Sequence, residues 1–194
     1  MPALVCGRPM QVLETVRLFI RPFTLDDLQK AHRLLDLDLQ WAGPGFTLVQ
    51  RKARLQFAID LSQWAVTGNL YGDRAIVLKE SGQLIGMCGF RPWLLAPAER
   101  SLYGQVACDS PFSALELGVG YGLSSAHRGQ GYAAEAVKAL IEYGFKELHV
   151  ARIVALTERG NTDSVRLMKR VGMQVGLNPA PVDYPWAVGM IENK

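Results

Sequence analysis

Apolar and polar residues alternate near the start of the chain and then take on helical spacing. The segment VRLFIRP at residues 16–22 alternates basic and apolar residues, which predicts a half-buried strand ended by Pro22. Thr24 and Asp27 have the spacing of a helix start, and apolar residues recur at helical spacing after them. A second helix is predicted over residues 49–66.

The next part of the chain predicts three strands and the strongest helix. Residues 74–78 and 84–90 are apolar segments joined by a glycine-containing turn, the pattern of a hairpin. Residues 92–111 are predicted to form a long loop, and such a loop in a compact domain is either functional or poorly ordered. A glycine-rich strand follows at 114–123, and residues 131–148 carry a continuous apolar helical stripe.

The remaining segments complete a sheet with helices. A short strand is predicted at 152–156, a helix at 163–171, and closing strands at 173–175 and 186–191. This order predicts an α+β, or mixed α/β, fold rather than a sandwich or a helix bundle. The length of 194 residues fits one domain, so a single domain is predicted over residues 1–194.

Composition and charge exclude several classes of protein. The formal net charge of +3 comes without the dense basic run of a nucleic-acid-binding protein, and it suits a protein that holds one small anionic ligand. Three cysteines without regular spacing, Cys6, Cys88 and Cys108, form neither a disulfide framework nor a metal-ligand pattern, which predicts unpaired thiols and no metal site. Neither a signal peptide nor a membrane-spanning apolar run is predicted, so we expect a cytoplasmic location and no membrane partner.

The candidate chemistry lies between the glycine-rich strand and the strongest helix, in the segment LSSAHRGQGYAAE at residues 123–135. A helix N-terminus leaves backbone N–H groups unpaired and carries roughly half a positive charge. Gly129 and Gly131 have no side chains to keep an anion away from those N–H groups, and Arg128 adds a full charge. The segment therefore predicts a cradle for a phosphate or pyrophosphate.

The same glycines allow two other interpretations. An ordinary structural turn is one, because glycines before a helix are common. A dinucleotide-binding oxidoreductase is the other, since Gly129, Gly131 and Ala134 match Gly-x-Gly-x-x-Gly/Ala and Glu158 follows the next strand. That fold needs several parallel βα units, however, and fewer than 70 residues follow the loop.

Three motifs along the chain belong together. LETVRLFIRPF stands at residues 13–23, RGQGYA at 128–133, and NTDS at 161–164, with Gly172-Met173 after the last. They resemble, in that order, an opening strand, an acetyl-CoA loop of pattern Gln/Arg-x-x-Gly-x-Gly/Ala, and an Asn-x-x-Ser helix with its following Gly-Phe. These are features of the GNAT acetyltransferase superfamily, and more narrowly of its ribosomal-protein N-terminal acetyltransferase branch, the RimJ/RimL-like enzymes. The resemblance covers about residues 13–190.

The resemblance implies a GNAT-type acyl-CoA N-acyltransferase fold. That fold has a mostly antiparallel twisted sheet, splayed at its fourth and fifth strands and flanked by helices, and its core would span about residues 13–191. Acetyl-CoA would be the co-substrate, with no metal. The pyrophosphate would be held by backbone amides of Arg128, Gly129, Gln130, Gly131, Tyr132 and Ala133.

The resemblance also implies roles along the pantetheine arm of acetyl-CoA. Leu123 and Ser124 would pair with this arm as if it were another strand, and Asn161 would hydrogen-bond it. Ser164 would lie near the thiol and protonate the leaving sulfur. Without the resemblance, Asn161 is an ordinary turn residue and Ser164 a solvent-facing or capping hydroxyl.

Two positions depart from the family's pattern. Ala126 replaces the first Gln/Arg of the loop, which removes a side-chain contact to phosphate but leaves the backbone amides. Gly118 stands where this branch often carries a glutamate on the fourth strand. Glu116, two residues earlier on the same strand face, is the candidate base in its place. The alternative is a surface glutamate near a strand start.

The implied activity is transfer of the acetyl group to an amine by direct attack in a ternary complex. We expect a protein or peptide α-amine, since its lower pKa makes a base less necessary. The acceptor would enter beside Trp41 and the 92–111 loop, although Trp41 is equally well interpreted as a core anchor. A non-catalytic acetyl-CoA sensor and an acetyltransferase of a small-molecule amine remain alternatives, and so do a monomer and a homodimer.

Overall fold

A computed structural model describes residues 12–41, 43–63, 71–94, 115–177 and 186–193. The chain divides into two compact units, which comprise residues 1–89 with 121–136 and residues 90–120 with 137–194. Three elements run from one unit into the other: β4 (Leu84–Leu94), β5 (Leu115–Leu123) and α4 (Tyr132–Lys146). The single domain over residues 1–194 stays a prediction.

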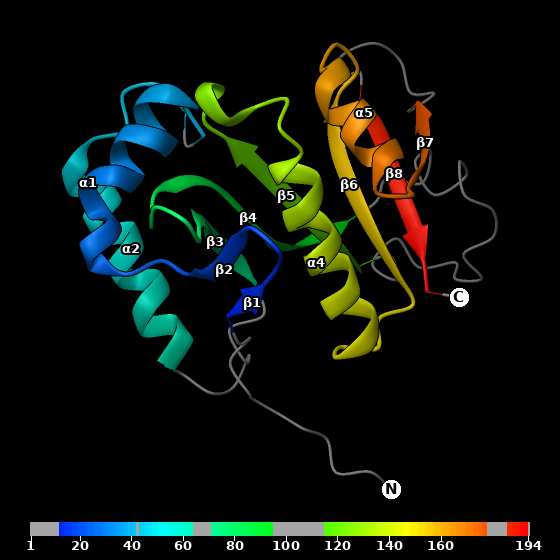
Figure 1. The fold of residues 1–194 in the computed structure, drawn as a ribbon, viewed down its shortest axis with the longest axis horizontal. Coiled ribbons are helices and arrows are strands. Elements are labelled where there is room, and N and C mark those ends of the chain that lie inside the picture. The colour runs from blue at the N-terminus through cyan, green and yellow to red at the C-terminus, as the bar shows by residue number, and fades with distance from the viewer. Residues whose placement is uncertain (1–11, 42, 64–70, 95–114, 178–185, 194) are drawn as a thin grey trace, which may run out of the picture. The chain divides into compact units, whose positions relative to one another are not determined.

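The opening of the chain forms strands and helical segments of the first unit (Figure 1). Its strands are β1 (Leu13–Glu14), β2 (Leu18–Pro22) and β3 (Gly72–Leu78), and β2 pairs antiparallel with both of the others. The predicted first strand is confirmed as β2, where Leu18 and Ile20 are fully buried. Its helical segments are η1 (Leu25–Asp27), α1 (Leu28–Ala31), η2 (His32–Asp38) and α2 (Leu48–Gln63).

Apolar side chains from helices and strands meet in one core cluster of the first unit. The helices contribute Leu35 and Leu55, and the strands contribute Ala75, Val77 and Met87. The predicted hairpin is confirmed: the amide of Gly82, whose φ is +66°, donates to the carbonyl of Leu78 (2.9 Å). A positive φ is a conformation that glycine adopts without strain, which explains this residue in the turn.

A buried ion pair joins η2 to α2. The side chain of Asp36 is fully buried and receives two hydrogen bonds from the guanidinium of Arg51, one of them from Nε at 2.9 Å. The imidazole Nδ1 of His32 lies 2.8 Å from the same carboxylate. The pKa of Asp36 is lowered, because the hydrogen bonds from Arg51 and His32 outweigh the opposing effect of burial. Both charges are therefore satisfied within the unit.

The second unit ends the chain with three strands and a helix. These are β6 (Arg152–Glu158), α5 (Thr162–Arg170), β7 (Gln174–Leu177) and β8 (Trp186–Glu192). β8 pairs antiparallel with both β6 and β7, and α5 packs on these strands (Figure 1). Met168 of α5 is fully buried. These elements confirm the predicted order of the last four.

The hydrogen-bonded strand order is β1-β2-β3-β4-β5-β6-β8-β7. The pairings of β2, β3, β6, β7 and β8 described above are antiparallel, whereas β5 and β6 are parallel. That parallel pairing covers only Leu117↔Ile153 and Gly118↔Val154, although β6 has seven residues. The pairings described are thus antiparallel except for one short parallel contact, which agrees with the expected GNAT-type fold, in which two neighbouring strands splay apart.

The predicted loop at 92–111 is wrong at its start. Pro92, Trp93 and Leu94 belong to β4, and the rest of the predicted loop lies outside the described residues. Proline can lie in a strand wherever its nitrogen is not needed as a donor. Cys88 is an unpaired, fully buried thiol whose pKa is raised by burial, while Cys6 and Cys108 lie outside the described residues. In the part of the chain that the structure describes, no helix is long and apolar enough to cross a membrane.

Candidate active site

The predicted phosphate loop connects the end of β5 to α4. After β5 the chain makes a short turn, η4 (Ser125–His127), and then passes through Gly129 and Gly131 to the helix start at Tyr132. The two glycines have φ angles of +75° and +84°. A Cβ at Gly129 would meet no protein atom within 4 Å, so the surface there is open. Glycine is needed here for the backbone conformation and leaves the peptide exposed.

The amides of this loop are available to an anion. The first intrahelical hydrogen bond of α4 runs from the amide of Glu135 to the carbonyl of Gly131 (3.0 Å). Among the turn, loop and cap hydrogen bonds between backbone groups of the described residues, none has an amide from Gly129 to Ala134 as its donor. These amides point from the positive end of a 15-residue helix, which is the arrangement that binds phosphate.

Side chains of the loop fasten its backbone. Nε of Arg128 donates to the carbonyl of Leu123 (3.2 Å), and Nε2 of Gln130 donates to the carbonyl of Ala126 (3.1 Å). Arg128 is exposed, so its charge remains beside the glycines. These two hydrogen bonds stabilise the loop conformation, and a loop held in its binding conformation binds at a lower entropic cost.

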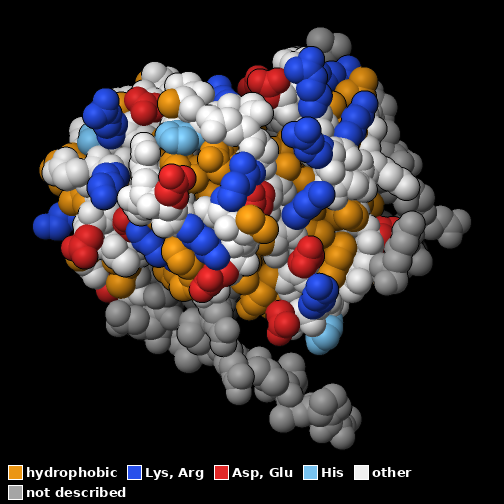
Figure 2. All heavy atoms as spheres, in the orientation of Figure 1, with side chains coloured by type: hydrophobic (Ala, Val, Ile, Leu, Met, Phe, Trp, Pro, Cys, Tyr) orange, Lys and Arg blue, Asp and Glu red, His pale blue; other side chains and the backbone are white. Residues whose placement is uncertain are grey.

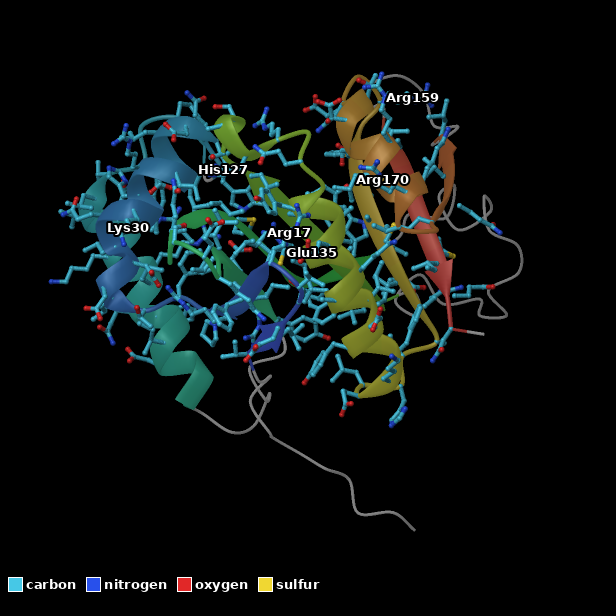
Figure 3. The ribbon with its side chains drawn as sticks, viewed as in Figure 1. Arg17, Lys30, His127, Glu135, Arg159 and Arg170 are labelled. Carbon is cyan, nitrogen blue, oxygen red and sulfur yellow. The ribbon has the colours of Figure 1, made fainter. Side chains whose placement is uncertain are left out.

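Residues just before β2 bind Glu135 in the first turn of α4. The sequence analysis did not predict this contact. One carboxylate oxygen of Glu135 accepts from Thr15 Oγ1 (2.6 Å) and from the backbone N–H of Arg17 (2.8 Å), and the other accepts from Nε of Arg17 (2.7 Å). Nη1 of Arg17 also donates to the carbonyl of Gln130 (3.1 Å), and its guanidinium lies 4.2 Å from the ring centre of Tyr132. Figure 3 shows Arg17 and Glu135 side by side. We call Thr15, Arg17 and Glu135 the loop clamp.

The loop clamp makes stability depend on pH. Burial raises the pKa of Glu135, but hydrogen bonds from Thr15 and from the backbone and guanidinium of Arg17 outweigh it and lower the pKa overall. The stabilisation is therefore complete above the unfolded-state pKa of about 4.3 and is lost as pH falls through the lower folded-state pKa. We expect denaturant titrations to show stability falling below about pH 4, less steeply in Glu135→Gln. An equal pH dependence in both proteins would contradict this.

Leu123 and Ser124, the two residues predicted to pair with pantetheine, differ in their contacts within the protein. The amide of Ser124 already donates to the carbonyl of Ile85 (2.9 Å), and its hydroxyl lies 2.7 Å from Nδ1 of His127. Leu123, whose side chain is buried, precedes it on the strand. The amide of Ser124 is thus already engaged, and the pairing of Leu123 and Ser124 with pantetheine stays a prediction.

Trp41 lies in the first unit and packs against the core cluster of that unit. Its ring lies 3.7 Å from the position that a Cβ on Gly122 would occupy. Its backbone N–H donates to the carbonyl of Leu35 (2.7 Å). These contacts show Trp41 as a core anchor, and its acceptor-binding role stays a prediction.

Glu116 lies in the second unit and is not a surface residue. Its exposed fraction is 7%. Both carboxylate oxygens accept hydrogen bonds from Arg152, one from Nε at 2.8 Å and one from Nη2. At Gly118, a Cβ would lie only 3.2 Å from the carbonyl oxygen of Arg91 and 3.3 Å from Cβ of Trp93. This tight packing explains glycine where the family branch often carries glutamate, and the base role of Glu116 stays a prediction.

Asn161 and Ser164 stand together at the start of α5. Asn161 is the N-cap, and its side-chain oxygen accepts from the backbone N–H of Ser164 (3.1 Å). Its side-chain nitrogen makes no hydrogen bond with any residue in the described ranges, so it remains a donor for a ligand. Ser164 is half-buried in the first turn, at the positive end of the helix.

Basic side chains lie before α5 and along it. Arg159 before the helix and Arg166, Lys169 and Arg170 on it are exposed, and Figure 2 shows blue side chains gathered over this segment. Figure 3 labels Arg159, which precedes the helix, and Arg170, which ends it. Lys169 and Arg170 lie in the last turn, where cations stabilise the negative end of a helix. Their position thus has a structural explanation.

Known proteins are similar to this chain in sequence and in fold. A family model described as "Acetyltransferase (GNAT) domain" matches residues 17–174. The uncharacterised N-acetyltransferase p20 of Bacillus licheniformis is 30% identical over 175 residues, which are 85% of this chain and 83% of that protein. An acetyltransferase structure from Agrobacterium tumefaciens C58 is 26% identical with a TM-score of 0.63, covering 94% of this chain and 95% of that one.

A ribosomal-protein acetyltransferase has the same fold with coenzyme A bound. RimL, described as a ribosomal L7/L12 alpha-N-protein acetyltransferase in complex with coenzyme A, has a TM-score of 0.64 and 14% identity, covering 94% of this chain and 98% of that one. The family match decides against the dinucleotide-binding oxidoreductase. By its family model, its relatives and its fold, the chain belongs to the GNAT acetyltransferase family and is an acyl-CoA N-acyltransferase.

Proposed function

We propose that this enzyme transfers acetyl from acetyl-CoA to the α-amine of a protein or peptide, with the pyrophosphate bound by the loop from Arg128 to Ala133. The observation that supports this most is the row of unpaired amides at the start of α4, fixed in place by the loop clamp. A structural neighbour described as an alpha-N-protein acetyltransferase supports the choice of acceptor.

The chemistry requires a neutral amine, a polarised carbonyl and a protonated leaving group. The amine nitrogen attacks the thioester carbon, a C–N bond forms, and the C–S bond breaks. A main-chain N–H of β5 would polarise the carbonyl oxygen. The sulfur would take its proton from the hydroxyl of Ser164, which is reprotonated from water as the amine loses its own proton. The positive end of α5 favours the thiolate, and the side-chain nitrogen of Asn161 would hold the pantetheine arm.

The pKa of the acceptor decides how much a base contributes. Deprotonating a lysine side chain at pH 7 costs about 4.6 kcal/mol, whereas an α-amine costs about 1 kcal/mol. The carboxylate of Glu116 is occupied by Arg152, so a site without a dedicated base suits an α-amine better.

The acceptor class is tested by CoA release from acetyl-CoA with two versions of one peptide. One version has a free N-terminus and no lysine, and the other has a blocked N-terminus and one lysine. We expect the first to react at least about tenfold faster near pH 7, because its amine is far more often neutral. Faster reaction of the lysine peptide would contradict the proposal. Faster reaction of a polyamine or aminoglycoside would favour the small-amine alternative, and tight binding without any transfer would favour the sensor.

A further inference from the structure

Among the described residues of the second unit, Glu116 and Arg152 form a charge pair that engages both carboxylate oxygens. The carboxylate uses both oxygens, and the guanidinium meets it with Nε and Nη2 in a two-pronged contact. The side chains are 7% and 21% exposed, so little water reaches either. By contrast, Asp163 and Arg166 in the same unit form a pair whose side chains are 80% and 78% exposed.

The pair lies directly before the parallel contact between β5 and β6. Glu116 immediately precedes Leu117 on β5, and Arg152 immediately precedes Ile153 on β6. Leu117 and Ile153 are the first of only two paired positions between these strands. The ion pair therefore adds a side-chain connection directly beside a backbone pairing of two positions.

Both carboxylate oxygens of Glu116 are occupied by hydrogen bonds from Arg152. Removal of either side chain would leave the charge of the other without its partner in a mostly enclosed place. The hydrogen bond to Glu116 raises the pKa of Arg152, so the cation stays charged throughout the working range of an enzyme. The two-pronged geometry is that of a fixed connection between β5 and β6.

We propose that Glu116 and Arg152 form a positioning clip, which fixes β5 against β6 so that the pantetheine arm and the thioester are held in register along β5. The inference rests on the proposed function, because it assigns the clip to acetyl-CoA placement. Neither residue touches the reacting atoms in this role. The base role predicted for Glu116 leads to different results in the same variants.

The test compares Glu116→Gln, Arg152→Gln and Arg152→Lys in steady-state assays across pH, with Arg166→Gln as the exposed-pair control. We expect both glutamine variants to lose at least about tenfold in kcat/KM for acetyl-CoA, since small misplacements are costly in transfer reactions. The shape of the pH profile should match that of the native chain. Arg152→Lys should keep more activity than Arg152→Gln, and Arg166→Gln should behave as native.

Two results would overturn the clip. A base role for Glu116 is indicated by two results together. Glu116→Gln removes the acidic limb of the pH profile, and Arg152→Gln keeps the native maximal rate but moves the acidic limb to higher pH. A purely structural role is indicated if the variants melt earlier but keep native kcat and KM well below their Tm. If the glutamine variants do not fold, Arg152→Lys decides alone: the clip predicts a raised KM for acetyl-CoA and an unchanged KM for the acceptor, and native constants would contradict it.

Failure of the proposed function would look different. The native chain is measured first for acetyl-CoA binding and for CoA release with the free-N-terminus peptide. If it shows neither, the proposed function is wrong whatever the variants do. If it shows both and the variants retain native kinetics, only the clip is wrong.

Discussion

Gly129→Val is expected to bind acetyl-CoA at least about 100-fold more weakly than the native chain, a loss of about 2.7 kcal/mol. Gly129 has a φ of +75°, which a β-branched residue adopts only with strain. The strain is relieved by turning the neighbouring peptides, and these carry the amides that we assign to the pyrophosphate. A Cβ at this position would meet no protein atom within 4 Å, so protein packing does not account for such a loss. Isothermal titration with acetyl-CoA measures the affinity.

Gly82→Val is the matched control. Gly82 also has a positive φ, +66°, and a Cβ there would also meet nothing within 4 Å, but it lies in the turn between β3 and β4. Both variants should lose similar stability, because the backbone strain is alike. Only Gly129→Val should lose affinity for acetyl-CoA. Equal affinities of the two variants would show that the loop does not bind the cofactor.

Glu135→Ala is expected to reduce the free energy of unfolding by about 3 kcal/mol, since three hydrogen bonds to a partly buried carboxylate disappear together. It should also weaken acetyl-CoA binding by about tenfold, as Arg17 loses the partner that orients it against the carbonyl of Gln130 and the ring of Tyr132. Denaturant unfolding and titration with acetyl-CoA measure the two effects.

Glu142→Ala is the control for a glutamate on the same helix. Its ion pair with Lys146 has side chains 65% and 71% exposed, and exposed pairs of this kind contribute about 0.5 kcal/mol or less. We expect native affinity for acetyl-CoA in this variant. A loss of affinity as large as that of Glu135→Ala would mean that the loop clamp has no special role.

The phosphate loop was predictable because its signals are local. A strand, two glycines and a helix follow one another within residues 115–146, and each has a pattern of its own. The capping of α5 by Asn161 is local in the same way. The loop clamp was not predictable, because Arg17 and Glu135 are 118 residues apart. No local sequence pattern around either residue indicates which residue it contacts. A threonine and an arginine two residues apart before a strand, and an acid in the first turn of the strongest helix, were the only signals.

Glu116 shows the same limit for a single residue. From its place near a strand start, Glu116 could be interpreted either as a base or as a surface residue. The structure instead buries it against Arg152, which is 36 residues away along the chain. Strand spacing gives the face on which a side chain lies but not the side chain that meets it. The predicted loop at 92–111 failed at Pro92 for a related reason, because proline disfavours strands in general but not where its nitrogen needs no partner.

The most direct measurement is a crystal structure of the chain with acetyl-CoA. We predict pyrophosphate oxygens within about 3.2 Å of backbone nitrogens in the loop from Gly129 to Ala133, as in an ordinary hydrogen bond. An acetyl-CoA molecule bound elsewhere, with these amides facing only solvent, would contradict the account.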